Sequence, residues 1–211
     1  MSNEYGYVDV SNINQIKENS GVLSVDDLYD LQSNGHLGGS LELIEEQDIT
    51  SSTSAVIFDN LSSNYEVHFL TCMNVTSDTD GSYLVMQLSN DNGSSYRTSG
   101  YHYAHFYGTA AGSFAEARSN SSTQLFLSGN LGTAANEKGN TYAYIYNLSN
   151  SSFYTSMNHH GSDVIATGDL RFMWGGGTYP ANAETHDAFK VFMNSGSITE
   201  GNFKLFGIKE L

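Results

Sequence analysis

The chain has 211 residues, which is enough for one large domain, or a domain with an appendage, that buries a sizeable core. Its 39% hydrophobic residues, 21 glycines and single proline are typical of a folded, β-rich protein and exclude a disordered chain. Eight Lys and Arg residues against 23 Asp and Glu give a net charge of -15, which repels phosphate and anionic lipid and argues against nucleic acid as a partner.

The first ten residues, MSNEYGYVDV, lack the charged and apolar regions of a signal peptide, and no segment approaches 18 consecutive apolar residues. We therefore expect no membrane insertion and no secretory route. The single cysteine, Cys72, excludes an internal disulfide. Because it lies in a strand-like run, we expect a buried free thiol.

Residues 1–39 carry a helical pattern in two short pieces. The first places Ile13 and Ile16 on a single turn. In the second, LSVDDLYDLQSNG, a capping serine and two aspartates precede Leu28 and Leu31, which share a helix face. Helices this short are not stable alone. The apolar stripe therefore predicts an attachment segment that docks either on the rest of the chain or on another protein.

From residue 40 onward the pattern changes to period two, with short apolar and aromatic runs between Gly, Asn and Ser turns. We expect strands at 40–49, 54–61, 65–73, 82–89, 95–107, 122–129, 140–148, 152–160, 163–174, 188–194 and 202–209. Short strands at this spacing, without alternating helices, predict an antiparallel sandwich or barrel over residues 40–211. They argue against an α/β enzyme fold.

Two loops combine glycine with oxygen ligands. In TSDTDGSYLVMQ, Asp78 and Asp80 fall at ligand positions of a calcium loop, but the twelfth position is Gln87, so the bidentate acid is missing. A turn is the favoured interpretation. In QLSNDNGSSY, Asn92-Gly93 is a strong signal for a hairpin turn. We expect neither a metal site nor a cofactor.

A catalytic interpretation is open at one place only. His160, Ser162 and Asp163 could form a catalytic group if the chain turns sharply at Gly161. On a regular strand, adjacent His159 and His160 instead project to opposite faces. Neither a nucleophile elbow nor a zinc-ligand spacing accompanies them. We therefore expect a protein without enzymatic activity.

Two tyrosine stripes follow the strand period. Tyr101, Tyr103 and Tyr107 share one strand face, and Tyr142 and Tyr144 share another. Tyrosine combines a large ring with a polar tip, which suits subunit interfaces and stacking on sugars. Cross-strand packing or a subunit contact is the favoured interpretation, and glycan contact is the alternative.

The stretch WGGGTYP holds the only tryptophan, Trp174, followed by three glycines and Tyr179. We interpret it as a glycine-rich loop. A buried Trp174 would anchor such a loop, and the alternative is that the two aromatic side chains recognise a host glycan.

Three segments in order carry a resemblance. They are GGSLELIEEQDIT, AVIFDNLSSNYEVHFLTCMNVTSDTDGSYLVMQLSNDNGSSY and MNSGSITEGNFKLFGIKEL, and they span most of residues 40–211, while about 108–180 match only in texture. This combination resembles a family of tailed-phage virion proteins, particularly from marine phages. The resemblance implies a jelly-roll-like β-sandwich in a fibre or decorating part of the particle, commonly trimeric, attached through a short N-terminal segment.

We therefore expect a non-enzymatic virion structural protein, a tail fibre or capsid decoration, displayed on the particle surface as a homotrimer. Residues 1–39 would contact other virion proteins. The alternative from another class is a module that binds a host surface glycan. A glycan depolymerase is a third hypothesis, since the separation of paired carboxylates cannot be read from sequence.

Overall fold

The computed structural model describes residues 41–61, 63–112 and 114–208. These residues form an all-β structure of antiparallel strands, and no helix occurs among them. The predicted helices of residues 1–39, with Ile13, Ile16, Leu28 and Leu31, lie outside the described residues. Their role in attachment remains a prediction.

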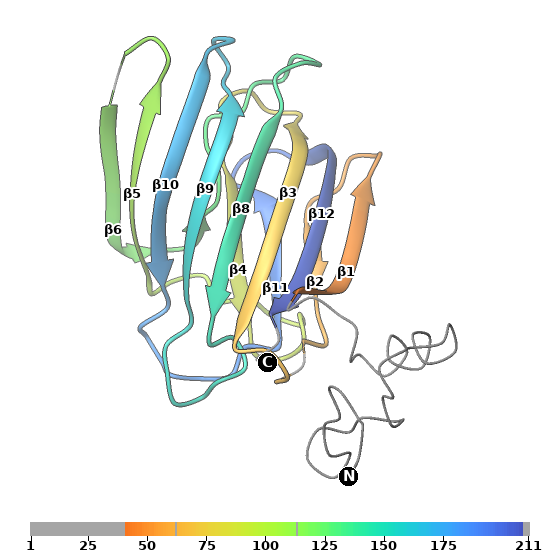
Figure 1. Cartoon of the computed structure of the whole chain (residues 1–211), viewed down its shortest axis with the longest axis vertical. Coiled ribbons are helices and arrows are strands. Elements are labelled where there is room, and N and C mark those ends of the chain that lie inside the picture. The colour runs from red at the N-terminus through yellow and green to blue at the C-terminus, as the bar shows by residue number, and fades with distance from the viewer. Residues whose placement is uncertain (1–40, 62, 113, 209–211) are drawn as a thin grey trace, which may run out of the picture. The chain divides into compact units, whose positions relative to one another are not determined.

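The strands form two sheets (Figure 1). The eight-stranded sheet has the order β1 (Leu41–Ile49), β12 (Ile198–Ile208), β3 (Val67–Ser77), β8 (Gly139–Tyr146), β9 (Ser156–Val164), β10 (Leu170–Thr178), β5 (Tyr101–Thr109) and β6 (Phe114–Ser122). The four-stranded sheet has the order β2 (Val56–Phe58), β11 (Ala188–Met193), β4 (Leu84–Ser89) and β7 (Leu125–Phe126).

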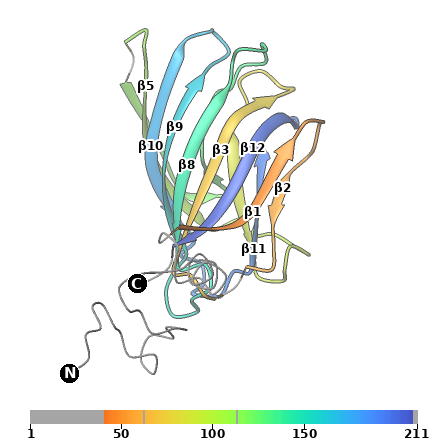
Figure 2. The same ribbon diagram turned by 45° about the vertical axis from the view of Figure 1, so that its right-hand side comes forward.

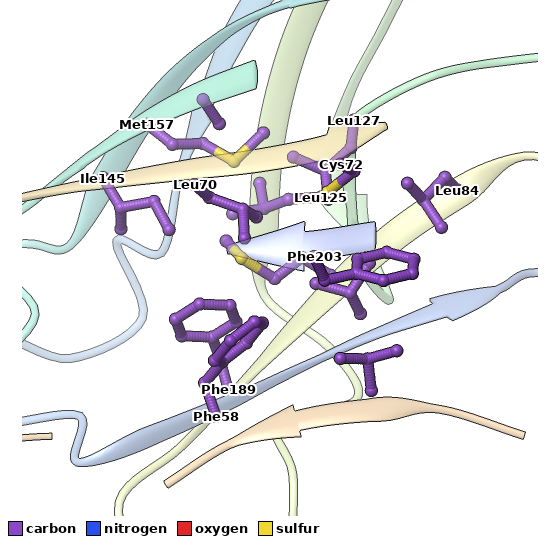
Figure 3. Close-up of a cluster of buried hydrophobic side chains, with 14 of the residues drawn as sticks. Phe58, Leu70, Cys72, Leu84, Leu125, Leu127, Ile145, Met157, Phe189 and Phe203 are labelled. Carbon is purple, nitrogen blue, oxygen red and sulfur yellow. The ribbon is translucent and has the colours of Figure 1, made fainter. Parts of the chain in front are cut away.

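Both sheets contribute to one hydrophobic core. Phe58 and Phe189 from the four-stranded sheet lie in the same buried cluster as Leu70 and Phe203 from the eight-stranded sheet (Figure 3). Figure 1 shows β4 and β11 of the smaller sheet behind β8, β3 and β12, and the turned view brings β2 out beside β1 (Figure 2). The strands β1, β12, β3 and β8 thus form the half of the larger sheet that covers the smaller one. We call these four strands the core half, and β9, β10, β5 and β6 the extension. Cys72 is a buried free thiol in the core half, as predicted.

Burial alternates along the strands and identifies the two faces of the eight-stranded sheet. In β8, Ala143 and Ile145 are fully buried, whereas Tyr142 is 40% exposed. The inner face carries the core, and the outer face points away from it. This alternation is the period-two pattern on which the strand predictions rested, and most predicted strands are present.

Strand β6 was not predicted. Its sequence, FAEARSNSS, has one large apolar residue, Phe114, and its inner positions Ala115, Ala117 and Ser119 are small and partly buried. The alternation is therefore present but has little hydrophobic contrast. Strand β6 therefore depends on backbone pairing with β5, in which His105 lies opposite Ala117, and not on a strong local pattern.

The predicted loop at Trp174 is wrong, because β10 runs through it to Thr178. Gly175 lies opposite both His105 and His159. A Cβ atom added to Gly175 would lie 2.4 Å from the carbonyl oxygen of Ala104. Glycine is required here for the close approach of neighbouring strands, not for a turn.

The predicted hairpin at Asn92-Gly93 is also wrong. Both residues have positive φ, 54° and 82°, as such a turn requires. However, β4 pairs with β11 and β7, and β5 lies in the other sheet. The segment is a connection between sheets, and turn chemistry alone cannot distinguish it from a hairpin.

Candidate functional surfaces

Five adjacent strands of the eight-stranded sheet, β3, β8, β9, β10 and β5, have no charged residue on the outer face. Strands β3, β8 and β5 contain no Asp, Glu, Lys or Arg. The only such residues in β9 and β10 are Asp163 and Arg171, and both are buried on the inner face. In a chain with net charge -15, five adjacent strands with an uncharged outer face form a distinct surface.

Aromatic rings cross this outer face from strand to strand. Neighbouring ring centroids lie between 4.8 and 6.3 Å apart, which is the range of favourable aromatic contacts. We call the set the aromatic belt; it consists of Phe206, Phe69, Tyr142, Tyr144, His160, Phe172, Trp174 and Phe106. Phe172 is 43% exposed and Phe106 is 50% exposed. Large aromatic side chains this exposed and contiguous are typical of an interaction surface.

A groove of about 420 Å³ lies in the middle of the belt. Phe69, Tyr142, His160 and Phe172 line it. The hydroxyl of Tyr142 lies 2.8 Å from Nδ1 of His160, so that these two side chains hold each other on the surface. The predicted contact residues Tyr142, Tyr144 and Trp174 therefore lie together on the outer face, a grouping that the sequence did not indicate.

The inner face of the extension holds a second candidate site, which we call the Arg171 pocket. It has a volume of about 260 Å³ and is lined by Tyr83, Tyr103, His105, Tyr107, Ala117, Phe126, Arg171 and Asn194. The lining comes from β5, β6, β7, β10 and the residues that flank β4 and β11. Tyr103 and Tyr107, both from the predicted stripe, lie here on the face opposite to the belt.

Arg171 is buried without a carboxylate partner among the described residues. It is 5% exposed, and its Nε atom has no hydrogen-bond partner. The guanidinium carbon lies 4.0 Å from the centre of the Tyr107 ring and 5.5 Å from that of Tyr83. One terminal nitrogen donates a long hydrogen bond, 3.5 Å, to the Tyr83 hydroxyl. These contacts stabilise the cation only partly, because a buried charge normally requires an ion pair.

At pH 7 the histidines around Arg171 are neutral, and the buried carboxyl group of Asp163 is only partly ionised. Burial, together with the Arg171 charge, lowers the pKa of His105 to about 4. Burial also lowers the pKa of His159 to about 4. Asp163 accepts hydrogen bonds from the Ser128 hydroxyl and the Gly129 amide, but burial raises its pKa to about 7. Arg171 is therefore the one firmly charged residue lining the pocket.

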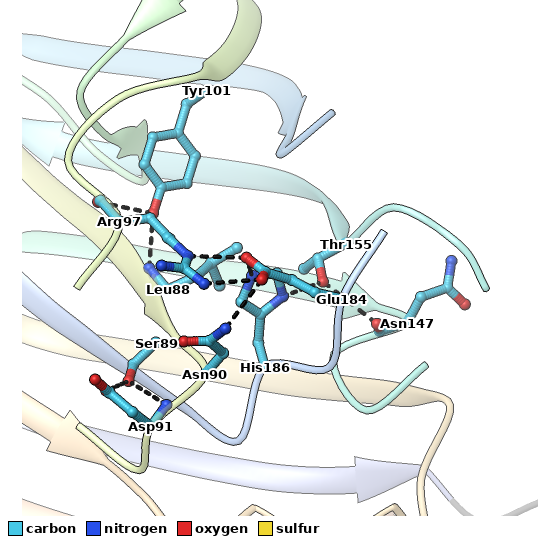
Figure 4. Close-up of polar contacts among 10 residues, drawn as sticks. All are labelled: Leu88, Ser89, Asn90, Asp91, Arg97, Tyr101, Asn147, Thr155, Glu184 and His186. Carbon is cyan, nitrogen blue, oxygen red and sulfur yellow. Dashed lines mark hydrogen bonds and ion pairs between the residues drawn. The ribbon is translucent and has the colours of Figure 1, made fainter. Parts of the chain in front are cut away.

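The predicted contact residues Tyr101 and Tyr179 belong to the structural core. Tyr101 is fully buried; its hydroxyl donates to the Arg97 carbonyl at 3.1 Å and accepts from the Leu88 amide at 2.8 Å (Figure 4). Tyr179 is 5% exposed and packs on Tyr101 with ring centroids 5.1 Å apart. Neither side chain is accessible to a ligand or a second subunit in this structure.

Arg97 also joins two connections near these tyrosines. Its guanidinium forms two hydrogen bonds of 2.8 Å to the carboxylate of Glu184. Nearby, the Asp91 carboxylate accepts a hydrogen bond from the Ser89 hydroxyl (Figure 4). It also accepts from the Ser95 hydroxyl and amide, and these hydrogen bonds lower the pKa of Asp91 to about 2. The loop at residues 90–93 is thus fixed by its own side chains and by Asp187, whose carboxylate accepts a hydrogen bond from the Asn92 amide at 2.8 Å.

The possible catalytic group does not assemble. Strand β9 continues without a turn through Gly161, so His160 and Ser162 are exposed on the outer face while Asp163 is buried on the inner face. At the other candidate loop, the Asp78 carboxylate accepts a 2.8 Å hydrogen bond from the Ser197 amide and another from Thr79. These interactions lower the pKa of Asp78 and fix the loop.

Sequence reasoning missed the two residues that distinguish the surfaces most clearly. Arg171 was read only as part of a strand, and Phe106 was not singled out. The stretch LRFMW alternates a basic and an apolar residue with two aromatic ones, so either set could face inward. Only the pairing of β10 with β5 and β9 decides between them.

Within the described part of the chain, no helix is long and apolar enough to cross a membrane. The same residues contain no group of three or more His, Cys, Asp or Glu side chains placed to hold a metal ion. Neither a family model, nor a curated protein, nor a solved structure matches the chain.

Proposed function

We propose that the chain is a non-enzymatic structural protein of a phage virion, a tail fibre or capsid decoration, that assembles with copies of itself through the outer face. The observation that carries the assembly proposal is the uncharged aromatic belt. Two chains of net charge -15 repel each other. Copies can therefore approach most closely through an apolar face without charges. Contact through the outer face would bury the aromatic belt.

Strand order supports a jelly-roll-like sandwich as the display module. The pairs β1 with β12, β2 with β11, β3 with β8 and β4 with β7 are neighbours in their sheets. In sequence, each of these pairs is nested inside the one before it. Successive pairs lie in alternate sheets, as expected when one long hairpin rolls up into a double sheet. Strands β5, β6, β9 and β10 then widen one sheet. The virion proteins that the sequence resembles are expected to contain modules of this architecture.

Mass in solution tests the assembly. A homotrimer has three times the 23.0 kDa mass of the chain. Phe172→Asp places a charge in the belt, so copies of the variant should dissociate toward monomers. Ile57→Asp is the matched control: it replaces an apolar residue that is 41% exposed on the four-stranded sheet and should leave the mass unchanged. A wild-type chain that is a folded monomer, or a Phe172→Asp variant that keeps its assembled mass, would contradict the proposal.

Testing attachment and location requires intact virus particles. Residues 1–39 are proposed to join the protein to other virion proteins, and a chain without them should fail to enter particles while its β structure, measured by circular dichroism, is kept. Incorporation of the shortened chain would show that attachment lies elsewhere. Antibody labelling seen by electron microscopy distinguishes a tail fibre from a head decoration, and an unlabelled particle counts against a virion protein.

A second function, binding of a host surface glycan, is favoured by the Arg171 pocket. Tyr103 and Tyr107 give it aromatic rings with polar tips, a combination suited to sugars. The two functions are compatible, because the pocket and the belt lie on opposite faces of the same sheet. Saturation-transfer NMR with host surface polysaccharide tests it: contact should disappear in a Tyr103→Ala, Tyr107→Ala double variant that remains folded.

A further inference from the structure

The Arg171 pocket has an electrostatic property that assembly does not use. Arg171 is 5% exposed, lines the cavity and leaves its Nε donor unpaired. A buried donor without a partner costs about 1–3 kcal/mol, and more when it is charged. A group that brings negative charge and acceptor oxygens to this place would remove that cost. A carboxylate does both, because its two oxygens match the geometry of the guanidinium fork.

The rest of the lining indicates what the carboxylate is attached to. Tyr83, Tyr103 and Tyr107 bring hydroxyl groups, and for Tyr103 and Tyr107 no hydrogen bond from the hydroxyl to a described residue occurs. Asn194 already uses its side-chain oxygen to accept from the Tyr83 amide at 2.8 Å. Phe126 closes one side, with its ring centroid 4.7 Å from that of Tyr103. Rings and free hydroxyls around a cation suit a ligand that is hydroxylated as well as acidic.

The size of the pocket limits the ligand further. Its 260 Å³ is just below the usual range of small-molecule sites, roughly 300–1,000 Å³. One small ring fits this space, and a longer chain would have to continue outside it. The small side chain of Ala117, on strand β6, keeps the cavity open on that side.

We infer that the Arg171 pocket is a binding site for a carboxylate-bearing sugar, with the carboxylate held by Arg171 and the sugar ring contacted by Tyr103 and Tyr107. The inference rests on the second proposed function and makes it specific, because it assigns acidic rather than neutral sugars to the pocket. It is independent of assembly through the belt. The net charge of -15 opposes non-specific binding of anions, so recognition of an acidic sugar requires this local cation.

Titration of the full chain with glucuronate, followed by protein NMR shifts, tests the inference. Glucose is the neutral counterpart of the same ring, and acetate carries the carboxylate without the ring. We expect glucuronate to bind more tightly than glucose by about tenfold or more, since one charge-assisted hydrogen bond of about 1.5–3 kcal/mol separates these two. Glucuronate should also bind more tightly than acetate, which lacks a ring for Tyr103 and Tyr107 to contact. Shifts should concentrate on residues of β5, β6 and β10.

Three variants locate the site. Arg171→Gln removes the charge and should weaken glucuronate binding about tenfold or more while leaving any glucose binding unchanged. Ala117→Leu keeps the charge but fills the cavity, and should abolish glucuronate binding. This variant tests the site independently if Arg171→Gln fails to fold. Arg118→Gln is the control, because this arginine side chain is 78% exposed at the next position of β6 and should be without effect.

The outcomes separate this inference from the function on which it rests. Glucose binding as tight as glucuronate binding would overturn the acidic-sugar inference and leave the glycan-binding function standing. Acetate binding as tight as glucuronate would likewise overturn it, since the pocket would then recognise a carboxylate without a sugar. Absence of binding by glucuronate and glucose would overturn the inference and remove the support for glycan binding. Unchanged glucuronate binding by folded Arg171→Gln and Ala117→Leu variants would place the ligand elsewhere and overturn the inference.

Discussion

The core half and the extension of the eight-stranded sheet share an outer face but differ on the inner one. In the core half, the inner face is mostly apolar, with Leu70, Ile145 and Phe203 packed against the four-stranded sheet. In the extension, the inner face also carries His105, His159, Asp163 and Arg171, all buried. Buried titratable groups are costly to a fold, and they concentrate at functional sites.

The two regions differ in what their buried residues contribute. The core half has the composition that stability requires. The extension has chemistry that stability does not require, beside a cavity. The outer faces of both regions share the aromatic belt across the uncharged strands β3, β8, β9, β10 and β5, while charged residues lie on the flanking strands β1, β12 and β6. We therefore propose two separate roles for the two faces of the extension: assembly through the outer face and ligand recognition through the inner face.

Removing a core phenylalanine should have the largest effect. Phe203 is fully buried on the inner face of β12, so Phe203→Ala should lower the free energy of unfolding by about 3–5 kcal/mol through lost burial and a new cavity. Phe206→Ala is the control three residues along the same strand, on the outer face, and should cost much less. Urea unfolding measures both. Equal losses would mean that the outer face is as well packed as the core.

Adding a methyl group should test the extension, where packing depends on glycine. A Cβ at residue 175 would lie 2.4 Å from both the Ala104 carbonyl oxygen and the His105 Cβ, so Gly175→Ala should destabilise the protein by about 3 kcal/mol. Gly161→Ala on neighbouring β9 is the control, because its nearest contact would be an ordinary 3.4 Å. Thermal unfolding compares them. A stable Gly175→Ala variant would mean that β5 and β10 can separate at low cost.

The strands were predictable because each presents local alternation, but the partner of each strand was not. Pairing of β1 with β12 joins the first and last described strands, and no local signal specifies a contact so distant in sequence. The same limit explains the Asn92-Gly93 error. Its backbone conformation was predictable from residue type, while the sheet that the chain enters next was not.

The candidate sites show the same division. That Tyr101, Tyr103 and Tyr107 share a face was predictable from period two, and all three do face inward. Which face was inward depended on register. The burial of Tyr101 and the position of Tyr107 beside Arg171 follow from β10 lying next to β5, which is a tertiary fact. The Arg171 pocket could not be predicted, because its lining comes from many separate segments.

Low pH should weaken both regions through buried histidines. Burial lowers the pKa of His68, in the core half, and of His105 and His159, in the extension, to about 4. The unfolded chain, with histidine pKa near 6.5, binds more protons than the folded one between about pH 6.5 and pH 4. The stability contribution of these residues is therefore complete above about pH 6.5 and is lost as the pH falls toward 4.

His68→Phe isolates one of these contributions. Both ring nitrogens of His68 are buried without hydrogen-bond partners, so phenylalanine removes no polar contact. Between about pH 7.5 and pH 5 the variant should lose about 2 kcal/mol less stability than the wild type. His102→Phe, at an exposed position of β5, is the control and should follow the wild-type pH curve. Urea unfolding at the two pH values measures the difference; parallel curves for His68→Phe and wild type would refute the assignment.

The smallest effect should come from the connections that join the extension to the four-stranded sheet. Arg97, before β5, forms its paired hydrogen bonds with Glu184, before β11, and their side chains are 29% and 19% exposed. Glu184→Gln keeps the shape of the side chain but removes its charge. It should lower the free energy of unfolding by about 1 kcal/mol, because a partly buried charge-assisted hydrogen-bond pair stabilises a protein more than an exposed one.

Glu116→Gln is the matched control. Glu116 pairs with Arg118 at 3.2 Å, but both side chains are more than half exposed, so the loss should stay within about 0.5 kcal/mol. Averaged urea-unfolding measurements distinguish the losses in unfolding free energy of the two variants. If Glu184→Gln loses no more than Glu116→Gln, the ion pair between the connections does not stabilise the protein measurably. The extension would then be held in place by strand pairing and core packing and not by the ion pair between these two connections.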